Sequence, residues 1–259
     1  MTVINLKNFN LNDISLNEPK TEQIKNEEGK ITGTYQRIQI KDLLIETPEL
    51  ISFGLKVSEN DGVSTISFIL WNKDKETGFY CPTKEQLEFT NNLSKLGEEL
   101  KSRVIQFHEE KKLLPSLSKY KSIDHLINTC PFYWGKEKFE AEEVIGKKGY
   151  FYNCPTLYVK LIESKKTGKN YTRFSDYFGN EMDISEVGNN VMNCYAAISY
   201  DSIFVNGSII KIQLKLKEVQ IKHRNKTLQR ILPIRQEQEL LIEETDDEYF
   251  DRKSRNGSF

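Results

Sequence analysis

The chain is poor in the residues that build metal sites and disulfide scaffolds. Its 259 residues include only four cysteines and three histidines, and no two cysteines stand in a Cys-x-x-Cys spacing. Structural zinc sites and small disulfide-bonded domains need closely spaced cysteines or histidines. We therefore expect reduced, mostly buried thiols and neither a metal nor another cofactor. A metal site assembled from distant cysteines and histidines is the less favoured alternative.

A long apolar segment is also lacking. No apolar run approaches the ~20 residues that a membrane-spanning helix needs. The first residues, Met1-Thr-Val-Ile-Asn-Leu-Lys7, show neither the basic start nor the long apolar stretch of a secretory signal peptide. We expect an intracellular protein that is not secreted and has no membrane partner.

The motifs of common enzyme classes are missing as well. Gly146-Lys-Lys-Gly149 is basic, but it has neither the spacing nor the following Ser or Thr of a phosphate-binding loop. There is no Gly-x-Ser-x-Gly and no His-Glu-x-x-His pattern. The carboxylates of Asp246-Asp-Glu248 lie in an acidic tail in which we expect no fold to hold them rigidly. We therefore expect no catalytic residues and no enzyme.

What the chain does have is an uneven distribution of charge and of aromatic rings. Residues 120–204 hold 16 of the 28 aromatic residues. Residues 101–235 carry a net charge of +9, whereas residues 1–100 and residues 236–259 each carry −5. Rings beside cationic groups suit an unpaired nucleic-acid strand, because bases stack on rings and phosphates pair with cations. The acidic tail would compete for the same groove or recruit protein partners.

The best-defined predicted element is a helix that begins after Thr83. Gln86 stands three residues later, which is the spacing of a capping box. Apolar residues then recur every three or four positions, so they form one helical face, which we expect to lie in the core. These residues are Phe89, Leu93, Leu96, Leu100, Val104 and Phe107.

Alternating segments on both sides of this helix predict strands. The expected strands cover residues 35–40, 50–57, 63–71, 149–152, 156–162, 170–174, 190–200 and 208–222. A hairpin is predicted across Gly62, a basic hairpin tip at residues 165–169, and a tight turn at Asn206-Gly207. In the last strand the alternation slips near Glu218, which predicts a β-bulge of the kind that bends a sheet into a small barrel.

We expect the polar side of this predicted sheet to bind nucleic acid, with tyrosines stacking on bases and cations pairing with phosphates. The candidate contact residues are Tyr133, Trp134, Tyr158, Lys160, Lys165, Lys166, Lys169, Tyr171, Arg173, Lys211, Lys215 and Lys217. Two alternatives to nucleic-acid binding stay open. The lysine row would then be only a solvated face of the sheet, and the Trp134 ring would anchor its loop in the core.

Residues 35–222 contain several segments that carry a resemblance. They are Ile45-Glu-Thr-Pro-Glu-Leu-Ile-Ser-Phe-Gly54, Leu70-Trp71, Pro155-Thr-Leu-Tyr-Val-Lys-Leu161, Ser202-Ile-Phe-Val-Asn-Gly-Ser208 and the lysine-rich last strand. The chain resembles a conserved family of OB-fold single-stranded DNA-binding proteins from nucleocytoplasmic large DNA viruses. The resemblance implies no catalytic signature.

Pattern and resemblance together predict an α+β fold, mainly antiparallel β. We expect an OB-like barrel or strongly curved sheet with insertions and one long helix between its third and fourth strands. Residues 1–33 would be a flexible arm, residues 34–235 a single OB-like nucleic-acid-binding domain, and residues 236–259 a disordered acidic tail.

The main functional hypothesis is a non-enzymatic single-stranded DNA-binding protein of viral DNA replication, with RNA as the alternative ligand. Viral replication proteins would be partners of the acidic tail. The expected location is the replication site in the host-cell cytoplasm, or the nucleus. The alternative from another class is a protein–protein adaptor or virion structural protein that uses the aromatic surface as an interface. A nuclease ranks third.

Overall fold

The computed structural model describes residues 3–4, 6, 10–11, 14–26, 28–58, 62–134, 141, 145–164, 167–188 and 190–224. The chain divides into two units, Met1–Thr227 and Leu228–Phe259. The acidic tail predicted for residues 236–259, and the domain end predicted at residue 235, lie outside the described residues.

Strands dominate the described part of the chain. They are β1 (Val3–Ile4), β2 (Ser15–Leu16), β3 (Lys20–Lys25), β4 (Ile31–Lys41), β5 (Leu44–Glu46), β6 (Leu50–Val57), β7 (Ser64–Ile69), β8 (Ile127–Asn128), β9 (Phe132–Tyr133), β10 (Thr156–Leu161), β11 (Arg173–Asp176), β12 (Met192–Val205) and β13 (Ile210–Arg224). The helices are α1 (Lys84–Glu109), α3 (Ile184–Val187) and the 3-10 turns η3 (Pro115–Leu117) and η4 (Asp124–Leu126).

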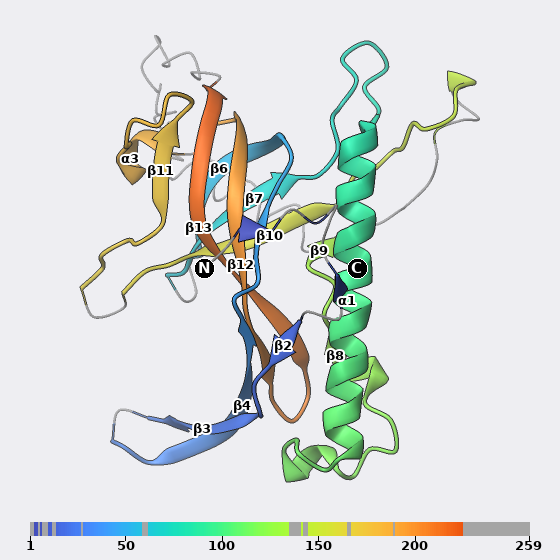
Figure 1. Cartoon of the computed structure of the whole chain (residues 1–259). Helices are drawn as coiled ribbons and strands as arrows, with labels where there is room; N and C mark the ends of the chain where they lie inside the picture. Colours follow the sequence, from blue (N-terminus) through green and yellow to red (C-terminus); the bar gives the residue numbers. More distant parts are fainter. Residues whose placement is uncertain are drawn as a thin grey trace, which may run out of the picture. The chain divides into compact units, whose positions relative to one another are not determined.

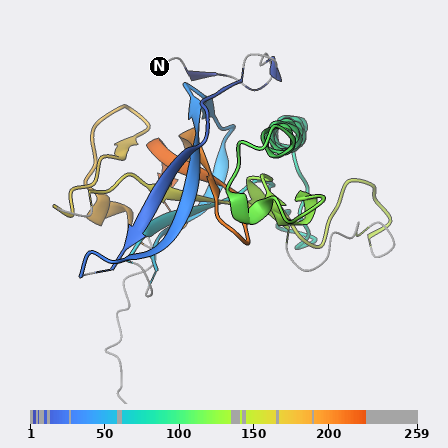
Figure 2. The ribbon, with the colours of Figure 1, turned by 90° about the horizontal axis from the view of Figure 1, so that it is seen from below.

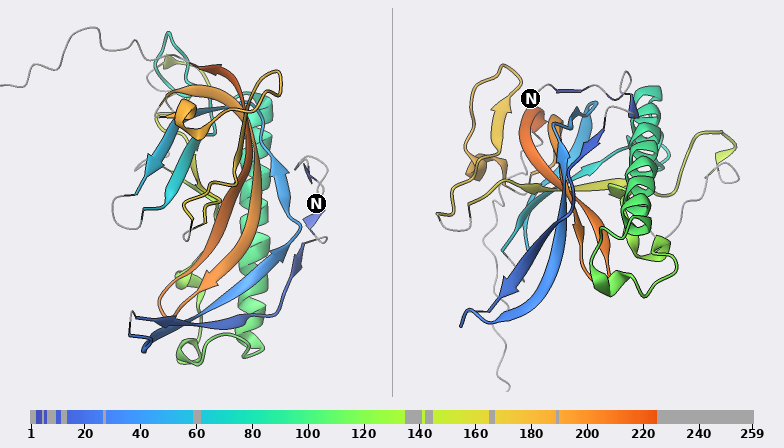
Figure 3. Two further views of the ribbon diagram at one scale, coloured as in Figure 1. Left: turned by 90° about the vertical axis from the view of Figure 1, so that its left-hand side faces the viewer. Right: turned by 60° about the horizontal axis from the view of Figure 1, so that its bottom comes forward.

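Five of the strands close into a barrel (Figure 1 and Figure 3). β6 pairs with β7, β7 with β10 and β10 with β13, and β13 then pairs with β12, which returns to β6. Of these five contacts around the ring, only the one between β10 and β13 is parallel. Counted along the chain, the ring runs first, second, third, fifth, fourth strand, which makes it a five-stranded Greek-key barrel of the OB type. The predicted fold class is confirmed.

The contacts around the ring differ greatly in length. β13 pairs with β12 along the whole of β12. By contrast, β10 and β13 pair only at Lys160 with Lys215 and at Leu161 with Leu216. Beyond this short seam, β9 pairs with β10 and β8 pairs with β13. The two small strands therefore lie where the barrel strands diverge.

The predicted bulge in the last strand is confirmed. Glu218 pairs with Ala197, but the next residue of β12, Ile198, pairs with Leu216. Lys217 is therefore the extra residue, and the alternation resumes one position later. Because of this shift, Val219 is buried, as Leu216 is, and the long strand keeps one face on the core while it bends.

Helix α1 forms as predicted. The Gln86 backbone N–H donates to the Thr83 hydroxyl, and the Thr83 N–H donates to the Gln86 side chain, each at 3.2 Å, so the capping box is complete. The predicted apolar face is buried against the barrel, with Phe107 partly buried at its end. At Gly97 the helix approaches the Thr129 carbonyl so closely that a Cβ would lie 3.0 Å from it. Figure 2 looks nearly along the helix, which lies to one side of the strands.

The position of α1 in the strand order corrects an expectation. We expected it between the third and fourth barrel strands, but it lies between β7 and β10, the second and third strands of the ring. The expected strand over residues 35–40 is not a separate member of the ring. It belongs to β4, which pairs with β12 as β6 does, so β4, β5 and β6 follow one another along the same neighbour.

The described part of residues 1–33, where the sequence suggested a flexible arm, contains paired strands. Within the described part, β2 and β3 pair with β4, and the β3–β4 ribbon extends away from the barrel in Figure 1. Leu6 and Ile14 are buried in the core. The Asn92 amide donates to the Leu6 carbonyl at 3.2 Å, and the Arg103 guanidinium to the Ile14 carbonyl at 2.8 Å. This polar segment is thus held by backbone pairing and by α1.

Two expected strands form differently. Residues 149–152 contribute only an isolated bridge between Phe151 and Tyr80. The segment expected to return along β10 forms one isolated bridge, between Asn170 and Glu163 beyond the end of β10, and then becomes β11, which pairs in parallel with β13. The predicted turn is present, but the strand that follows it pairs with the free edge of β13 and not with β10.

Candidate nucleic-acid interface

The most exposed aromatic pair on the barrel wall lies on β9 and β10. Along β10, Leu157 and Val159 are buried, whereas Tyr158 and Lys160 point outward, and Tyr158 is 50% exposed. Tyr133 of β9 is 52% exposed and lies opposite Thr156 in the register. The Tyr133 and Tyr158 rings meet edge to face, with centroids 5.8 Å apart and planes inclined by 63°. Both predicted residues thus lie together and are accessible.

A row of cations continues from this pair across β10, β13 and β11. Lys160 is the register neighbour of Lys215 on β13. Lys217 occupies the bulge beside Glu218, and Glu218 is the register neighbour of Arg173 on β11. The predicted cations of these strands therefore lie on one wall, where β10 and β11 follow one another along the edge of β13 that β12 does not occupy. Lys211, also exposed, lies further along β13 next to β8.

One cation of this row is already paired. The Lys215 ammonium lies 2.9 Å from the Asp201 carboxylate of β12. The sequence reasoning missed Asp201, because the residue follows the strand expected over residues 190–200 and only the pairing of β12 with β13 brings it to the lysine. Lys215 is consequently less available to a phosphate than its place in the row suggested.

Trp134 directly follows β9, and its side chain packs against the core. Its ring contacts Trp71 edge to face at 5.0 Å and Phe132 at 6.1 Å, and the side chain is partly buried against the core. The Trp71 indole N–H is in turn bonded to the Thr90 hydroxyl of α1 at 3.1 Å. This placement favours a packing role for Trp134 over base stacking.

Two further predicted residues, Lys169 and Tyr171, lie together before β11. Tyr171 is 54% exposed, and the Lys169 ammonium lies 5.5 Å from the centre of its ring. Lys165 and Lys166 lie outside the described residues.

Several exposed rings were missed by sequence reasoning. Phe53 on β6 is 45% exposed, and Tyr152 before β10 is 44% exposed. Tyr177 and Phe178 follow β11 and are 53% and 88% exposed. The turn that carries them is fixed by Asp176, whose carboxylate accepts hydrogen bonds from the backbone N–H groups of Phe178 and Asn180, each at 2.9 Å. Bonds from Asn180, chiefly its side-chain amide, lower the pKa of Asp176.

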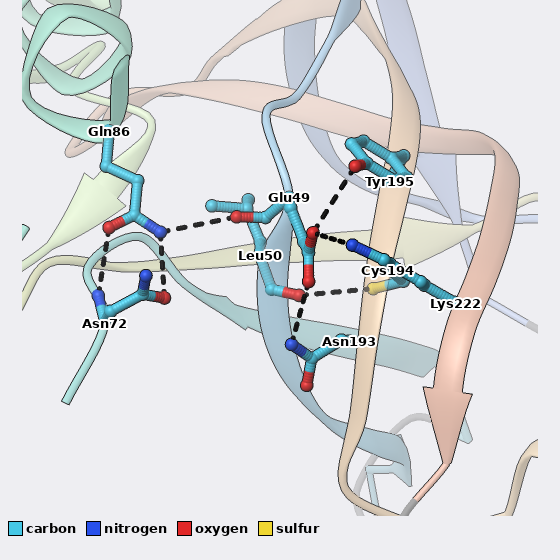
Figure 4. Close-up of polar contacts among 8 residues, drawn as sticks. All are labelled: Glu49, Leu50, Asn72, Gln86, Asn193, Cys194, Tyr195 and Lys222. Carbon is cyan, nitrogen blue, oxygen red and sulfur yellow. Dashed lines mark hydrogen bonds and ion pairs between the residues drawn. The ribbon is translucent and has the colours of Figure 1, made fainter. Parts of the chain in front are cut away.

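Glu49 joins three elements where the barrel closes between β12 and β6 (Figure 4). Its carboxylate accepts hydrogen bonds from the Asn193 amide at 3.0 Å and from the Lys222 ammonium at 2.7 Å. The Gln86 side chain of α1 donates to the Glu49 carbonyl at 3.3 Å. The bond from Lys222 lowers the pKa of Glu49, and the same bond raises the pKa of Lys222.

The four cysteines are free thiols. Cys154 and Cys194 are buried, and burial raises the pKa of Cys154 to about 11 and that of Cys194 to about 12. Cys81 is partly buried and Cys130 is exposed. Within residues 3–224, as far as the structure describes them, no group of three or more potential ligands could hold a metal ion. The described helices include none that is long and apolar enough to cross a membrane.

The fold and this wall define a small OB-type β-barrel protein with an exposed aromatic and basic face. The chain belongs to the family described as "Protein of unknown function (DUF2738)", whose model matches residues 12–256. No curated protein matches it in sequence.

Two solved structures are similar to the chain. One is gp2.5, a single-stranded DNA-binding protein encoded by bacteriophage T7, at 12% identity and a TM-score of 0.40, covering 73% of this chain and 97% of that one. The other is a single-stranded DNA-binding protein from bacteriophage Enc34, at 9% identity and a TM-score of 0.40, covering 83% of this chain and 96% of that one. Similarity this low does not assign a function, which has to come from the chain's own geometry.

Proposed function

We propose that this protein binds single-stranded DNA without catalysing a reaction. The observation that carries the proposal is the accessible pair of rings, Tyr133 and Tyr158, beside Lys160 on the barrel wall. β7 and β10 are the second and third strands of the ring, and in OB barrels the face of these strands binds oligonucleotides.

The geometry suits a base better than it suits a flat apolar partner. The rings are inclined to each other, so a base that stacks on one ring can touch the edge of the other. Stacking accepts any base, because every base has a π-face, and it contributes about 1–3 kcal/mol per base. In a duplex those faces are covered by neighbouring base pairs. Single strands should therefore bind more tightly than duplexes, with little sequence preference.

We further propose that the protein acts in viral DNA replication, by covering exposed template at the replication site in the host-cell cytoplasm or nucleus. The support is the resemblance of residues 35–222 to the viral family. RNA is the alternative ligand, because the described wall offers no evident feature that reads the sugar. The acidic residues 236–259 would recruit replication proteins. Deleting residues 237–259 should tighten DNA binding at low salt, because the acidic tail competes for the groove, and should abolish binding to the replication proteins.

The central test is a fluorescence anisotropy titration with single-stranded DNA, duplex DNA and RNA of equal length over a series of salt concentrations. Replacing Lys160 and Lys217 by Ala should reduce the slope of log affinity against log salt by about 1.4, since each phosphate contact on a single strand contributes about 0.7. Lys84→Ala with Lys95→Ala on the exposed face of α1 is the charge-matched control, which should leave the slope unchanged. Equal affinity for duplex and single strand would refute the proposal.

A second function, that of a protein adaptor, is favoured by one observation. Phe178, the most exposed large apolar side chain in the described residues, stands beside a cavity of about 500 Å³ that Glu181 and Glu186 help to line. Carboxylates repel nucleic acid, so a protein is the suitable partner there. A photo-reactive phenylalanine at position 178 should crosslink to a protein in infected cells. The same probe at Leu87 on α1 is the control, and equal crosslinking from both would dismiss this function.

A further inference from the structure

A second group of aromatic and basic side chains lies between the end of β7 and the start of β10. Two stretches of chain form it. One is the loop that joins β7 to α1 (teal in Figure 1), and the other is the segment 145–153. Tyr80 and Phe151 exchange two backbone hydrogen bonds of 2.9 Å, and Tyr80 also bridges to Lys73. These bonds tie the two stretches into one small surface.

The inner side of this surface is anchored in the core. Phe151 contacts Trp71 at 4.7 Å, and Trp71 contacts Trp134. Trp134 directly follows Tyr133, the exposed ring of the interface described above. The backbone of the second surface is therefore fixed to the same aromatic cluster that supports the first.

The outer side presents another exposed aromatic pair. Phe79 and Tyr152 meet edge to face, with ring centroids 5.1 Å apart and planes inclined by 88°. Tyr152 is 44% exposed, and Phe79 is partly exposed. The pair repeats the arrangement of Tyr133 and Tyr158, with one ring standing on the edge of the other.

Among the described residues, cations outnumber carboxylates around this second pair. Exposed lysines flank it from both stretches of chain, at Lys73, Lys75, Lys147 and Lys148. Asp74 and Glu76 lie in the same loop, but the Asp74 carboxylate is engaged locally. It accepts the Thr77 backbone N–H at 2.7 Å and the Thr77 hydroxyl at 2.9 Å. These bonds, and more weakly the charge on Lys147, lower the pKa of Asp74.

The two pairs are close along the chain. Tyr152 and Tyr158 are six residues apart, and an extended chain spans at most about 3.3 Å per residue, which places their Cα atoms within about 20 Å. One single strand of moderate length can reach both pairs, because single OB folds cover about 4–16 nucleotides.

We propose that Phe79 and Tyr152 form a second base-stacking subsite for the same single strand, with the four surrounding lysines contacting its phosphates. This inference rests on the proposed function and deepens it. A strand that stacks on Tyr133 and Tyr158 continues along the start of β10 to Tyr152. Short oligonucleotides fill only one of the two subsites, and longer ones fill both.

The test compares Tyr152→Ala and Tyr158→Ala with oligothymidines of about 4 and about 12 nucleotides. For the longer strand, each variant should lower the affinity about fivefold or more. For the shorter strand, Tyr158→Ala should remain harmful, whereas Tyr152→Ala should have no effect. Tyr152→Phe keeps the ring and should bind the longer strand as the natural protein does. Thermal unfolding checks that each variant is folded.

A second measurement keeps the proposal testable should the Tyr152→Ala variant fail to fold. In the natural protein, 5-iododeoxyuridine placed at successive positions of the longer strand should crosslink to Tyr152 or Phe79 from one end, and to Tyr133 or Tyr158 from the other. If Tyr158→Ala weakens binding but Tyr152→Ala and the crosslinks show no second contact, the subsite is refuted and the proposed function stands. If the natural protein binds no single-stranded DNA, the proposed function and the second subsite are both refuted.

Discussion

Two of the exposed aromatic pairs, Tyr133 with Tyr158 and Tyr177 with Phe178, have surroundings of opposite charge. Tyr133 and Tyr158 lie on the barrel wall beside Lys160, in a row of cations that runs across three strands. Tyr177 and Phe178 are at least as exposed, but they lie on the turn after β11 in the company of carboxylates. Exposed rings alone therefore do not define a nucleic-acid site, because the charge beside them decides which partner can approach.

The two pairs also differ in how they are held. Tyr158 extends from a strand that has neighbours on both sides. Phe178 sits on a turn that is fixed mainly by hydrogen bonds to the Asp176 carboxylate. A wall of paired strands can support an extended ligand over several residues, whereas a turn offers one projecting contact.

Removing the aromatic rings should produce the largest difference in DNA affinity between the two regions. Replacing Tyr133 and Tyr158 by Ala together should weaken single-stranded DNA binding by about 1–3 kcal/mol for each base that loses its stacking partner. Phe178→Ala should leave DNA affinity unchanged, although it removes a more exposed ring. Fluorescence anisotropy at fixed salt measures both. A comparable loss in the two variants would erase the distinction.

Trp134 and its neighbour Tyr133 should differ in the property that they affect. Trp134→Ala empties part of the cluster around Trp71, so unfolding should become easier by about 3 kcal/mol, the lower end of the range for large core aromatics, because the ring is only partly buried. Tyr133→Ala should change stability by no more than about 0.5 kcal/mol. Urea denaturation compares them. A stable Trp134→Ala variant with weak DNA binding would restore the stacking role.

Breaking the ion pair between Lys215 and Asp201 on the basic wall should strengthen DNA binding. Asp201→Asn frees Lys215 for a phosphate, so affinity for single-stranded DNA should rise, and the salt slope should steepen by up to about 0.7. In the background of Lys215→Ala the same change should add nothing to the slope. If Asp201→Asn steepened the slope even without Lys215, the carboxylate would act by general repulsion.

The smallest effect concerns the closure of the barrel at low pH. The lowered pKa of Glu49 means that its ionised form stabilises the folded state above the carboxyl's ordinary pKa. This contribution is lost as the pH falls through the lowered pKa, so the melting temperature should decline there by roughly 1–3 °C relative to Glu49→Gln. Differential scanning fluorimetry between pH 3 and pH 6 measures this. Parallel curves for the two proteins would exclude Glu49 as the cause.

Local patterns in the sequence were sufficient for the elements that depend on neighbouring residues. The capping box placed the start of α1, and the phase slip near Glu218 placed the bulge. Alternation along β10 predicted correctly that Tyr158 and Lys160 point outward. Each of these features is decided within one turn of helix or one stretch of strand.

Features that depend on residues far apart in the sequence could not be predicted from such local patterns. β11 joins β13 because β13 offers a free edge, which no pattern within residues 170–174 reveals. The polar strand β3 carries little apolar pattern, since its pairing with β4 is made by backbone groups. The role of Trp134 depends on Trp71, which lies far away along the chain. Asp201 lies beside the lysines only because β12 and β13 pair.

The short seam between β10 and β13 has a consequence for the order in which the barrel opens. Backbone amides exchange with solvent through the least costly local opening, and a seam of two residue pairs costs less to part than the long hairpin beside it. Lys160 and Lys215 face each other across this seam, so a phosphate backbone bound to both lysines would hold β10 and β13 together. Occupancy by DNA would then slow hydrogen exchange at Leu161 and Leu216 far more than at the hairpin, whose protection is already near that of the whole fold.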